Sequence, residues 1–369
     1  MNFDLTEEQQ MLADTTRDVL SGYDTEKRNK LIDTPIGSGL GWSRETWQQL
    51  AEIGILGLGF DEDSGPTEVM VVMTELGRRL ALEPVAAAAL IPGAVIAAHG
   101  SAEQRALLDA VAAGDKLLAF AHTEAGRRGS APLTTSASGK GDAWTITGTK
   151  SPVIAADSAD VLLVSAALPD GGAGLFLVDA DATTRTPYRT FDGQRGADVT
   201  FANAPAQPLG AGGDASAVVR EAVIRFQSAL CAEAVGAMDE SLRMTTEYLK
   251  TRKQFGVPLK TFQTLTQRAA DMYVSLELAR SMNYYAAVCV ADGRFDPIVA
   301  ARAKMQIGRS GKHIAQESIQ MHGGIGVTAE YPIAHYAARL TAIDQTFGSA
   351  TDHLRYLSKQ VGEYGVVTL

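Results

Sequence analysis

The sequence has few of the residues that build disulfide frameworks, metal centres or membrane segments. Only two of its 369 residues are cysteines, Cys231 and Cys289, and both lie in apolar helical patterns. This predicts buried thiols in a reducing compartment, which we take to be the cytoplasm. The six histidines are scattered, so we expect no metal site. No window reaches the ~18 apolar residues of a membrane span, and Met1–Glu8 does not resemble a signal peptide.

Basic runs and the common nucleotide-binding and hydrolase motifs are also missing. The net charge is −10, which argues against nucleic acid or an anionic membrane as a partner. There is no dinucleotide fingerprint after a strand, no P-loop, no zinc-protease helix and no nucleophile elbow. The near match to a P-loop at Gly308–Lys312 lies within a predicted helix, so we expect no phosphate there.

The composition is 46% hydrophobic, enough for a large core. The hydrophobic period changes twice along the chain, from helical to strand-like and back. We therefore predict an α+β fold in three domains. These are an N-terminal helical domain (1–115), a middle β-barrel domain (116–208) and a C-terminal four-helix bundle (217–369).

The first third has helix signals throughout. Thr6 and Gln9 predict a capping box for a helix to about Leu20, and Trp42-Ser43 introduces another. The Ala-rich segment Val85–Ala98 is too short to span a membrane, so we predict a buried helix. Further helices are expected at 67–80 and 103–113.

The middle third contains short apolar runs bounded by Gly, Asp and Pro, which predict an antiparallel β-domain or barrel. The runs are 143–147, 161–165, 175–178 and 199–201. A linker rich in Gly, Pro and Ala follows at 206–216. Beyond it, Asp296-Pro297 predicts a helix start, and a last helix is expected from about Ser349 to Glu363.

The stretch Glu247–Gln263 reads as the end of one helix, a sharp break and the start of another. Gly256 suits a left-handed residue after a helix, and Pro258 cannot continue one. We therefore expect Arg252 and Lys253 in the last helical turn. There they would at least cap the negative end of the helix dipole.

Four sequence motifs resemble those of the acyl-CoA dehydrogenase family, in the same order and over essentially the whole chain. The most similar group is the small subunit of heteromeric enzymes of the pimeloyl-CoA dehydrogenase type. The motifs are Arg-Lys-Gln-Phe-Gly at 252–256, Phe-Gln at 262–263, Gln-Met-His-Gly-Gly-Ile-Gly at 320–326 and Glu-Tyr-Pro at 330–332.

The resemblance implies FAD as the cofactor. It also implies that part of each FAD site is donated across a subunit interface. A guanidinium offers paired donors to a pyrophosphate, and a Gly-Gly turn lets backbone amides approach a cofactor. The alternative for the glycines is simple helix termination. The implied cofactor-binding residues are Arg252, Gln254, Phe255, Phe262, Gln263, Gln320, Gly323 and Gly324.

The other half of the family's site is not matched here. The family loop that contacts flavin and thioester corresponds to Thr123–Gly129, where Arg127 and Arg128 replace small residues. The family's Trp-x-Thr, which packs on the flavin, corresponds to Pro152 and Ile154. Proline offers no N–H donor and isoleucine has no polar side-chain group.

The catalytic base is missing from both of the family's usual places. Removal of the α-proton of an acyl-CoA needs a carboxylate. The family's Tyr-Glu-Gly-Thr turn corresponds to 347–350, Phe-Gly-Ser-Ala, and its alternative Glu position corresponds to Phe226. Three nearby carboxylates, Asp344, Asp352 and Glu233, could substitute. We name no catalytic residue in this chain.

Retention of only the donated half of the site predicts a hetero-oligomer, because a homo-oligomer needs both halves in every chain. The implied partners are a catalytic acyl-CoA dehydrogenase subunit, an acyl-CoA substrate and an electron-transferring flavoprotein. Two alternatives stay open. One is a self-sufficient homo-oligomer using Asp344 or Asp352 as base, and the other is a scaffold that binds no flavin.

Overall fold

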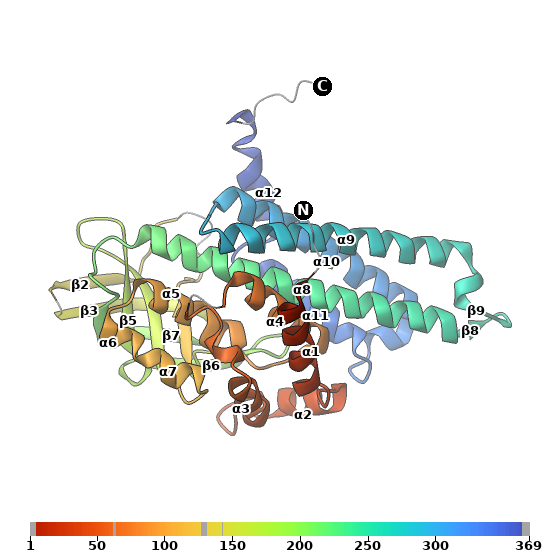
Figure 1. Cartoon of the computed structure of the whole chain (residues 1–369), viewed down its shortest axis with the longest axis horizontal. Helices are drawn as coiled ribbons and strands as arrows, with labels where there is room; N and C mark the ends of the chain where they lie inside the picture. Colours follow the sequence, from red (N-terminus) through yellow and green to blue (C-terminus); the bar gives the residue numbers. More distant parts are fainter. Residues whose placement is uncertain (1–4, 62–63, 127–130, 142, 364–369) are drawn as a thin grey trace. The chain divides into compact units, whose positions relative to one another are not determined.

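The computed structural model describes residues 5–61, 64–126, 131–141 and 143–363 (Figure 1). Within these residues the chain forms two compact units. The N-terminal unit contains residues 5–72 and 81–226, and the C-terminal unit contains 73–80 and 227–363. The division into three domains at 115 and 208 remains a prediction.

Helices open the N-terminal unit, and their starts follow the predicted caps. Helix α1 begins with the expected capping box, in which Thr6 accepts from the Gln9 amide at 3.2 Å. Ser43 caps α3. The helix predicted at 103–113 is broken into two, and a helix that was not predicted, α2, follows α1. The bounds are α1 Glu7–Val19, α2 Thr25–Asp33, α3 Arg44–Glu52, η1 Ile55–Gly57, α4 Pro66–Arg79, η2 Ala86–Leu90, α5 Ile91–His99, α6 Ala102–Arg105 and α7 Leu107–Ala112.

The Ala-rich segment is buried, as predicted. Its first turn, Ala86–Leu90, is a π-helix and continues directly into α5, and every residue from Ala86 to Ile96 is buried. In the part of the chain that the structure describes, no helix is both long and apolar enough to cross a bilayer.

The strands of this unit form a barrel. Five of them close a ring in the order β4-β2-β3-β7-β5 and back to β4, while β1 pairs with β4 and β6 with β7. The predicted barrel is confirmed, but its purely antiparallel pairing is wrong because β4 runs parallel to both β1 and β2. The bounds are β1 Leu118–Ala121, β2 Ser136–Lys140, β3 Ala143–Ile154, β4 Val161–Ala167, β5 Ala173–Asp179, β6 Thr184–Arg189 and β7 Arg195–Pro208.

A buried carboxyl group in this unit makes its stability depend on pH. Glu83 is 4% exposed, and its Oε1 accepts the Ser43 amide at 3.0 Å. Burial raises the pKa of Glu83 from 4.5 to about 7. In the folded protein the group therefore stays protonated up to about pH 7, whereas in the unfolded chain it ionises from its ordinary value.

We expect the stabilisation from protonated Glu83 to be complete below pH 4.5 and lost as the pH rises through 7. Its upper limit is about 3 kcal/mol. Glu83→Gln keeps the acceptor for Ser43 and should remove this part of the pH dependence. The unfolding temperature at pH 5 and pH 8 tests this. An unchanged difference between the two pH values in the glutamine variant would contradict it.

The C-terminal unit is a helical bundle. Its seam residues on α9, Met272, Leu276 and Ala279, are almost fully buried, and Asp296 caps α10 as predicted. The Gly308–Lys312 segment lies inside α10. The predicted last helix is confirmed as α12, and α11 was not predicted. The bounds are α8 Ser216–Thr251 (which begins in the N-terminal unit), α9 Gln263–Ala291, α10 Pro297–His322, α11 Ile333–Gln345, α12 Ala350–Ser358 and η6 Val361–Glu363.

Two glycines let α4 and α8 approach closely inside this unit. A Cβ on Gly236 would lie 1.9 Å from the Thr74 carbonyl oxygen, and a Cβ on Gly77 would lie 2.0 Å from that of Glu233. Both obstacles are backbone atoms, so no side-chain rotation relieves the clash. The two helices pack backbone against backbone at this point.

Gly236→Ala should therefore lower the free energy of unfolding by about 3 kcal/mol, the upper end of the usual cost of overpacking. Thermal unfolding followed by circular dichroism measures the effect. Gly22→Ala is the control, because nothing lies within 4 Å of a Cβ at Gly22. Equal unfolding temperatures for the two variants would contradict the close helix crossing.

Candidate functional site

The break after α8 is a β-hairpin rather than a helix end alone. Helix α8 ends at Thr251, and β8 (Lys253–Gln254) pairs with β9 (Val257–Pro258). The turn residues Phe255 and Gly256 have φ of 54° and 82°, the positive values that a two-residue hairpin turn requires. The prediction that Arg252 and Lys253 lie in the last helical turn is wrong for Lys253, where strand pairing begins. The Arg252 amide still makes a helical hydrogen bond to the Tyr248 carbonyl, although α8 ends one residue earlier. Gly256 is left-handed, as expected.

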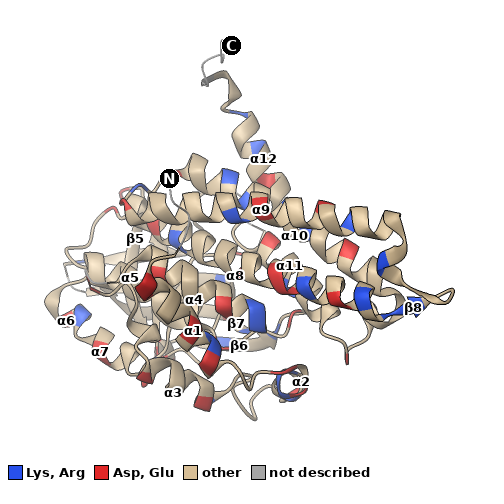
Figure 2. Ribbon diagram, turned by 45° about the vertical axis from the view of Figure 1, so that its right-hand side comes forward, with Lys and Arg blue, Asp and Glu red and all other residues tan. Residues whose placement is uncertain are grey.

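Arg252 is exposed and makes no side-chain hydrogen bond or ion pair within the described residues. Basic positions gather at the end of α8 and in β8 (Figure 2). Lys250 is paired with Glu247 at 2.6 Å, and Arg268 is paired with Glu317 at 2.5 Å. Arg252 is thus available to a ligand. The predicted glutamines are also exposed without partners in the described chain, namely Gln254, Gln263 and Gln320.

The two predicted aromatic residues lie together. The Phe255 side chain is 92% exposed, and its ring meets that of Phe262 edge to face, with centroids 6.2 Å apart. Phe262 directly precedes α9 and is half-buried. An aromatic side chain this exposed at a hairpin turn is suited to contact with another molecule.

The glycine pair ends α10 and leaves its backbone open. Gly323 has φ 65° and ψ −141°, a conformation that favours glycine. Gly324 is exposed, with nothing within 4 Å of a Cβ. The glycine pair therefore ends α10, with the Gly323 amide bonded to the Ile319 carbonyl, begins the 3-10 helix η5 (Gly323–Val327) and leaves open space where Cβ atoms would lie. The Tyr248 hydroxyl donates to the His322 carbonyl at 3.4 Å, which brings the end of α8 beside this turn. Sequence reasoning missed Tyr248.

These groups fit a flavin dinucleotide. The planar paired donors of Arg252 match phosphate oxygens. Because the guanidinium has no ion pair in the described chain, none has to break before it binds a phosphate. The open Gly323–Gly324 backbone can approach a cofactor where a Cβ would block it. Whether the eight predicted residues contact FAD remains a prediction.

The two strand positions of the N-terminal unit that correspond to the family's Trp-x-Thr have no side-chain hydrogen-bond donor. Pro152 is exposed, without an N–H, at a break in the β3–β7 register between Lys150 and Val153. Ile154 pairs with Gly196 and has no polar side-chain group. The predicted arginines of the neighbouring loop, Arg127 and Arg128, lie outside the described residues.

Glu124, in the same loop, has a structural role. Its carboxylate accepts hydrogen bonds from the Lys150 ammonium at 2.7 Å and from the amides of Thr134 and Thr135 at 2.8 and 3.0 Å. Burial raises the pKa of Glu124, but these hydrogen bonds outweigh burial and lower it to about 2. Glu124 therefore anchors the loop as a permanent anion and is unsuited to act as a base.

The usual base position holds no carboxylate, and its surroundings leave little room for one. The Phe347 carbonyl accepts Gln227 Nε2 at 3.0 Å and contacts His353 Nε2 at 3.1 Å. Gly348 has φ 100°, and a Cβ there would lie 3.0 Å from His353 Nε2. The alternative position, Phe226, is a buried aromatic residue. Sequence reasoning missed His353, which no motif marks.

Two of the three nearby carboxylates, Glu233 and Asp344, are engaged in structural contacts. Glu233 is buried in a two-pronged ion pair with Arg339, at 2.6 and 2.7 Å. Asp344 accepts the Ala350 amide at 2.9 Å, at the start of α12.

The third carboxylate, Asp352, closes the capping box of α12. It accepts the Ser349 amide at 3.1 Å and the Ser349 hydroxyl at 2.7 Å. Each of the three carboxylates thus accepts hydrogen bonds that hold local structure in place.

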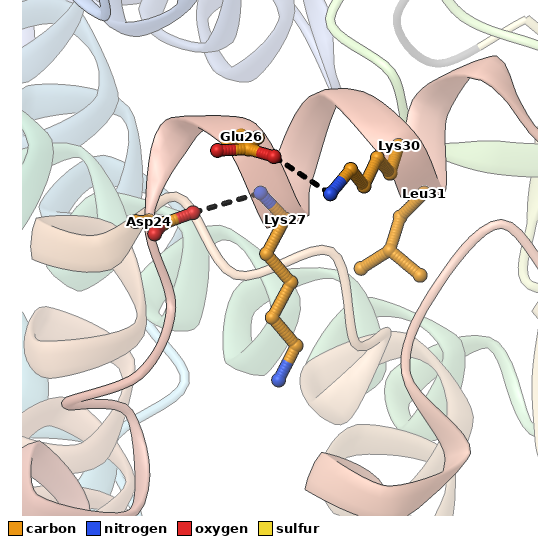
Figure 3. Close-up of a pocket in the computed structure, with 5 residues that line it drawn as sticks. All are labelled: Asp24, Glu26, Lys27, Lys30 and Leu31. Atoms are coloured by element: carbon orange, nitrogen blue, oxygen red, sulfur yellow. Dashed lines mark hydrogen bonds and ion pairs between the residues drawn. The ribbon is translucent and has the colours of Figure 1, made fainter.

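A hollow of about 340 Å³ beside α2 is no better candidate (Figure 3). Lys30 pairs with Glu26 at 2.7 Å, and the Lys27 ammonium lies over the Tyr23 ring, 5.6 Å from its centroid. Asp24 accepts the Lys27 amide at 2.7 Å and so caps the helix. None of the eight predicted cofactor-binding residues lines the hollow.

Across the described chain, no group of three His, Cys, Asp or Glu side chains is arranged to hold a metal ion. His122 bonds Ser165 and His313 bonds Ser275, each at 2.8 Å. Both cysteines are buried free thiols, as predicted.

Comparison with known proteins agrees with the motifs. The chain matches the model of the acyl-CoA dehydrogenase N-terminal domain over residues 6–115 and that of the C-terminal domain over residues 217–361. It is 28% identical to acyl-CoA dehydrogenase FadE27 of Mycobacterium tuberculosis, covering 98% of this chain and 99% of that protein.

Two solved structures resemble the chain over nearly its full length. A variant of the Tcur3481-Tcur3483 steroid ACAD has a TM-score of 0.89 and 32% identity, covering 97% of this chain and 98% of its own. The ChsE4-ChsE5 complex from Mycobacterium tuberculosis has a TM-score of 0.89 and 27% identity, covering 99% and 100%. The fold, the motifs and these likenesses together show that the chain belongs to the acyl-CoA dehydrogenase family.

Proposed function

We propose that this chain is the small, base-lacking subunit of a heteromeric acyl-CoA dehydrogenase that uses FAD. The reaction is α,β-dehydrogenation of a CoA thioester. One contrast carries the proposal. Arg252 and the open Gly323–Gly324 turn are free to contact a cofactor, whereas Gly348 stands where the family has its glutamate.

FAD, the cofactor of the family, accepts the β-hydride of the substrate when it is bound. In our proposal, Arg252 neutralises its pyrophosphate, and the amides of Gln254, Gln263 and Gln320 add hydrogen bonds. The Gly323–Gly324 backbone contacts the cofactor closely. Phe255 and Phe262 cover its apolar surface and exclude water. None of these groups moves a proton, so the carboxylate base comes from the partner chain.

The proposed partner is a second acyl-CoA dehydrogenase chain that holds most of the FAD. The ChsE4-ChsE5 structure is a complex of two named chains, and the Tcur3481-Tcur3483 protein is a steroid ACAD. We therefore propose bulky acyl groups, such as steroid side-chain thioesters, as substrates. An electron-transferring flavoprotein is the proposed electron acceptor.

A self-sufficient homo-oligomer is less well supported. Asp344 and Asp352 would each have to leave a helix-capping contact to act as a base. Glu233 would have to leave Arg339, which would bury an uncompensated guanidinium. A scaffold without flavin would not need an exposed Arg252 that makes no side-chain contact in the described chain.

Activity of the reconstituted complex tests the proposal. The chain is co-expressed with each acyl-CoA dehydrogenase of its source organism in turn, and complexes are isolated by size exclusion. Reduction of an artificial electron acceptor is then measured with a panel of acyl-CoA thioesters. We expect activity only in a complex, and Asp344→Asn should leave it unchanged. Turnover by the lone chain that Asp344→Asn abolishes would contradict the proposal.

A further inference from the structure

Three aromatic rings from separate parts of the chain form a cluster beside the glycine turn. The ring of His322 contacts those of Tyr248 and Tyr331, with centroids 4.4 Å and 5.0 Å away and ring planes tilted by 31° and 49°. Tyr248 belongs to the last turns of α8, His322 ends α10, and Tyr331 precedes α11. The ring cluster therefore joins three segments at the point where Gly323 begins the turn.

Two hydrogen bonds of Tyr248 connect this ring cluster to the two arms of the proposed FAD site, which are Arg252 and the Gly323–Gly324 turn. The Tyr248 hydroxyl donates to the His322 carbonyl at 3.4 Å, next to Gly323. The backbone carbonyl of Tyr248 accepts the Arg252 amide at 2.8 Å. The side chain of Tyr248 thus contacts the residue that precedes the glycine pair, and its backbone holds the Arg252 backbone through a helical hydrogen bond.

The imidazole of His322 is a buried, neutral ring that packs against its neighbours and does not bind the cofactor through a charge. His322 is 3% exposed, and its Nδ1 bonds the Ser318 carbonyl at 2.8 Å, so Nδ1 carries the proton. Its Nε2 is buried and has no hydrogen-bond partner in the described chain. Burial lowers the pKa of His322. A buried neutral ring can set the position of neighbouring backbone but cannot reach a phosphate.

We propose that Tyr248 and His322 are positioning residues that set the distance between Arg252 and the Gly323–Gly324 turn. The inference rests on the proposed function, in which both arms contact one FAD held by the partner chain. A bound cofactor contacts two arms at once only if their spacing matches its bound conformation, and a small misplacement loses much of the gain. In this proposal the ring cluster sets the spacing between Arg252 and the glycine turn from inside this chain.

FAD affinity of the complex, measured by flavin fluorescence titration, tests the proposal. His322→Ala should weaken FAD affinity by about tenfold or more, because the ring that Tyr248 and Tyr331 contact is lost. His322→Phe keeps an aromatic ring and should stay within about threefold of wild type. The control is His313→Ala, on the same helix. The imidazole of His313 bonds Ser275 and lies outside the ring cluster. Size exclusion confirms that each variant still forms the complex.

A double-mutant cycle separates positioning from general stability. In an Arg252→Ala background, His322→Ala should weaken FAD binding by less than about threefold, because only one arm remains to be positioned. An equal loss in both backgrounds, or an unchanged affinity of His322→Ala, would overturn the proposal while leaving the proposed function intact. A wild-type complex without flavin would overturn both.

Discussion

Arg252→Ala should reduce FAD affinity of the complex by roughly 2–4 kcal/mol, about 30- to 1,000-fold. The guanidinium is exposed and has no partner in the described chain, so its whole hydrogen-bonding capacity is free for a diphosphate. The flavin-to-protein ratio after gel filtration measures the effect. Arg252→Lys should recover only part of it, because lysine lacks the paired planar donors.

The matched control is Lys253→Ala, the next basic residue, which is also exposed and lies in β8. It should leave the flavin content nearly unchanged. If Arg252 only caps α8, its replacement would lower stability by about 1 kcal/mol or less and leave the flavin in place. That outcome would remove the arginine from the proposed site.

Gly348→Glu should give the lone chain almost no dehydrogenase activity, although it restores a carboxylate at the family's usual position. Gly348 has φ 100°, where a side chain costs about 1–3 kcal/mol. Its Cβ would also lie 3.0 Å from His353 Nε2. A base helps only when flavin and substrate are already in position, and the Pro152 and Ile154 positions offer the flavin no hydrogen-bond donor.

The assay is reduction of an artificial acceptor with a panel of acyl-CoA thioesters, on the lone wild type and the variant. Gly348→Ala is the control, since it shares the backbone strain without the carboxylate. The two variants should lose similar stability, and neither should turn over substrate. Robust turnover by Gly348→Glu alone would mean that the lone chain has a complete pocket, and the half-site proposal would be wrong.

Local signals in the sequence were sufficient for much of the fold. Thr6 and Asp296 cap the helices that they predict, because capping depends on a few neighbouring residues. The Ala-rich segment is buried because its side chains are apolar on every side. Helix α2 was missed because its sequence is mostly polar, with Arg28 its buried residue.

Long-range pairing was beyond the reach of local patterns. Strand β2 has the sequence Ser-Ala-Ser-Gly-Lys, which carries no apolar run, and it is a strand because β3 and β4 pair with it. The parallel pairing of β1 with β4 likewise depends on contacts between segments far apart in the chain.

For the site, the motifs located residues but not their surroundings. The sequence names Arg252 but cannot reveal that it is unpaired while Lys250 and Arg268 are not. It also gave no sign that His353 lies against Gly348, because that contact depends on how α12 packs. The contacts of the His322 ring with Tyr248 and Tyr331 also depend on how helices pack, so the sequence did not reveal them.

The visible absorbance spectrum of the purified chain, alone and then with its partner, tests the half-site proposal most directly. The lone chain should be colourless or weakly flavinated, since one arm of a divided site does not retain FAD. The complex should be yellow and carry flavin in proportion to the number of interface sites. A stoichiometric flavin spectrum from the lone chain would contradict the proposal.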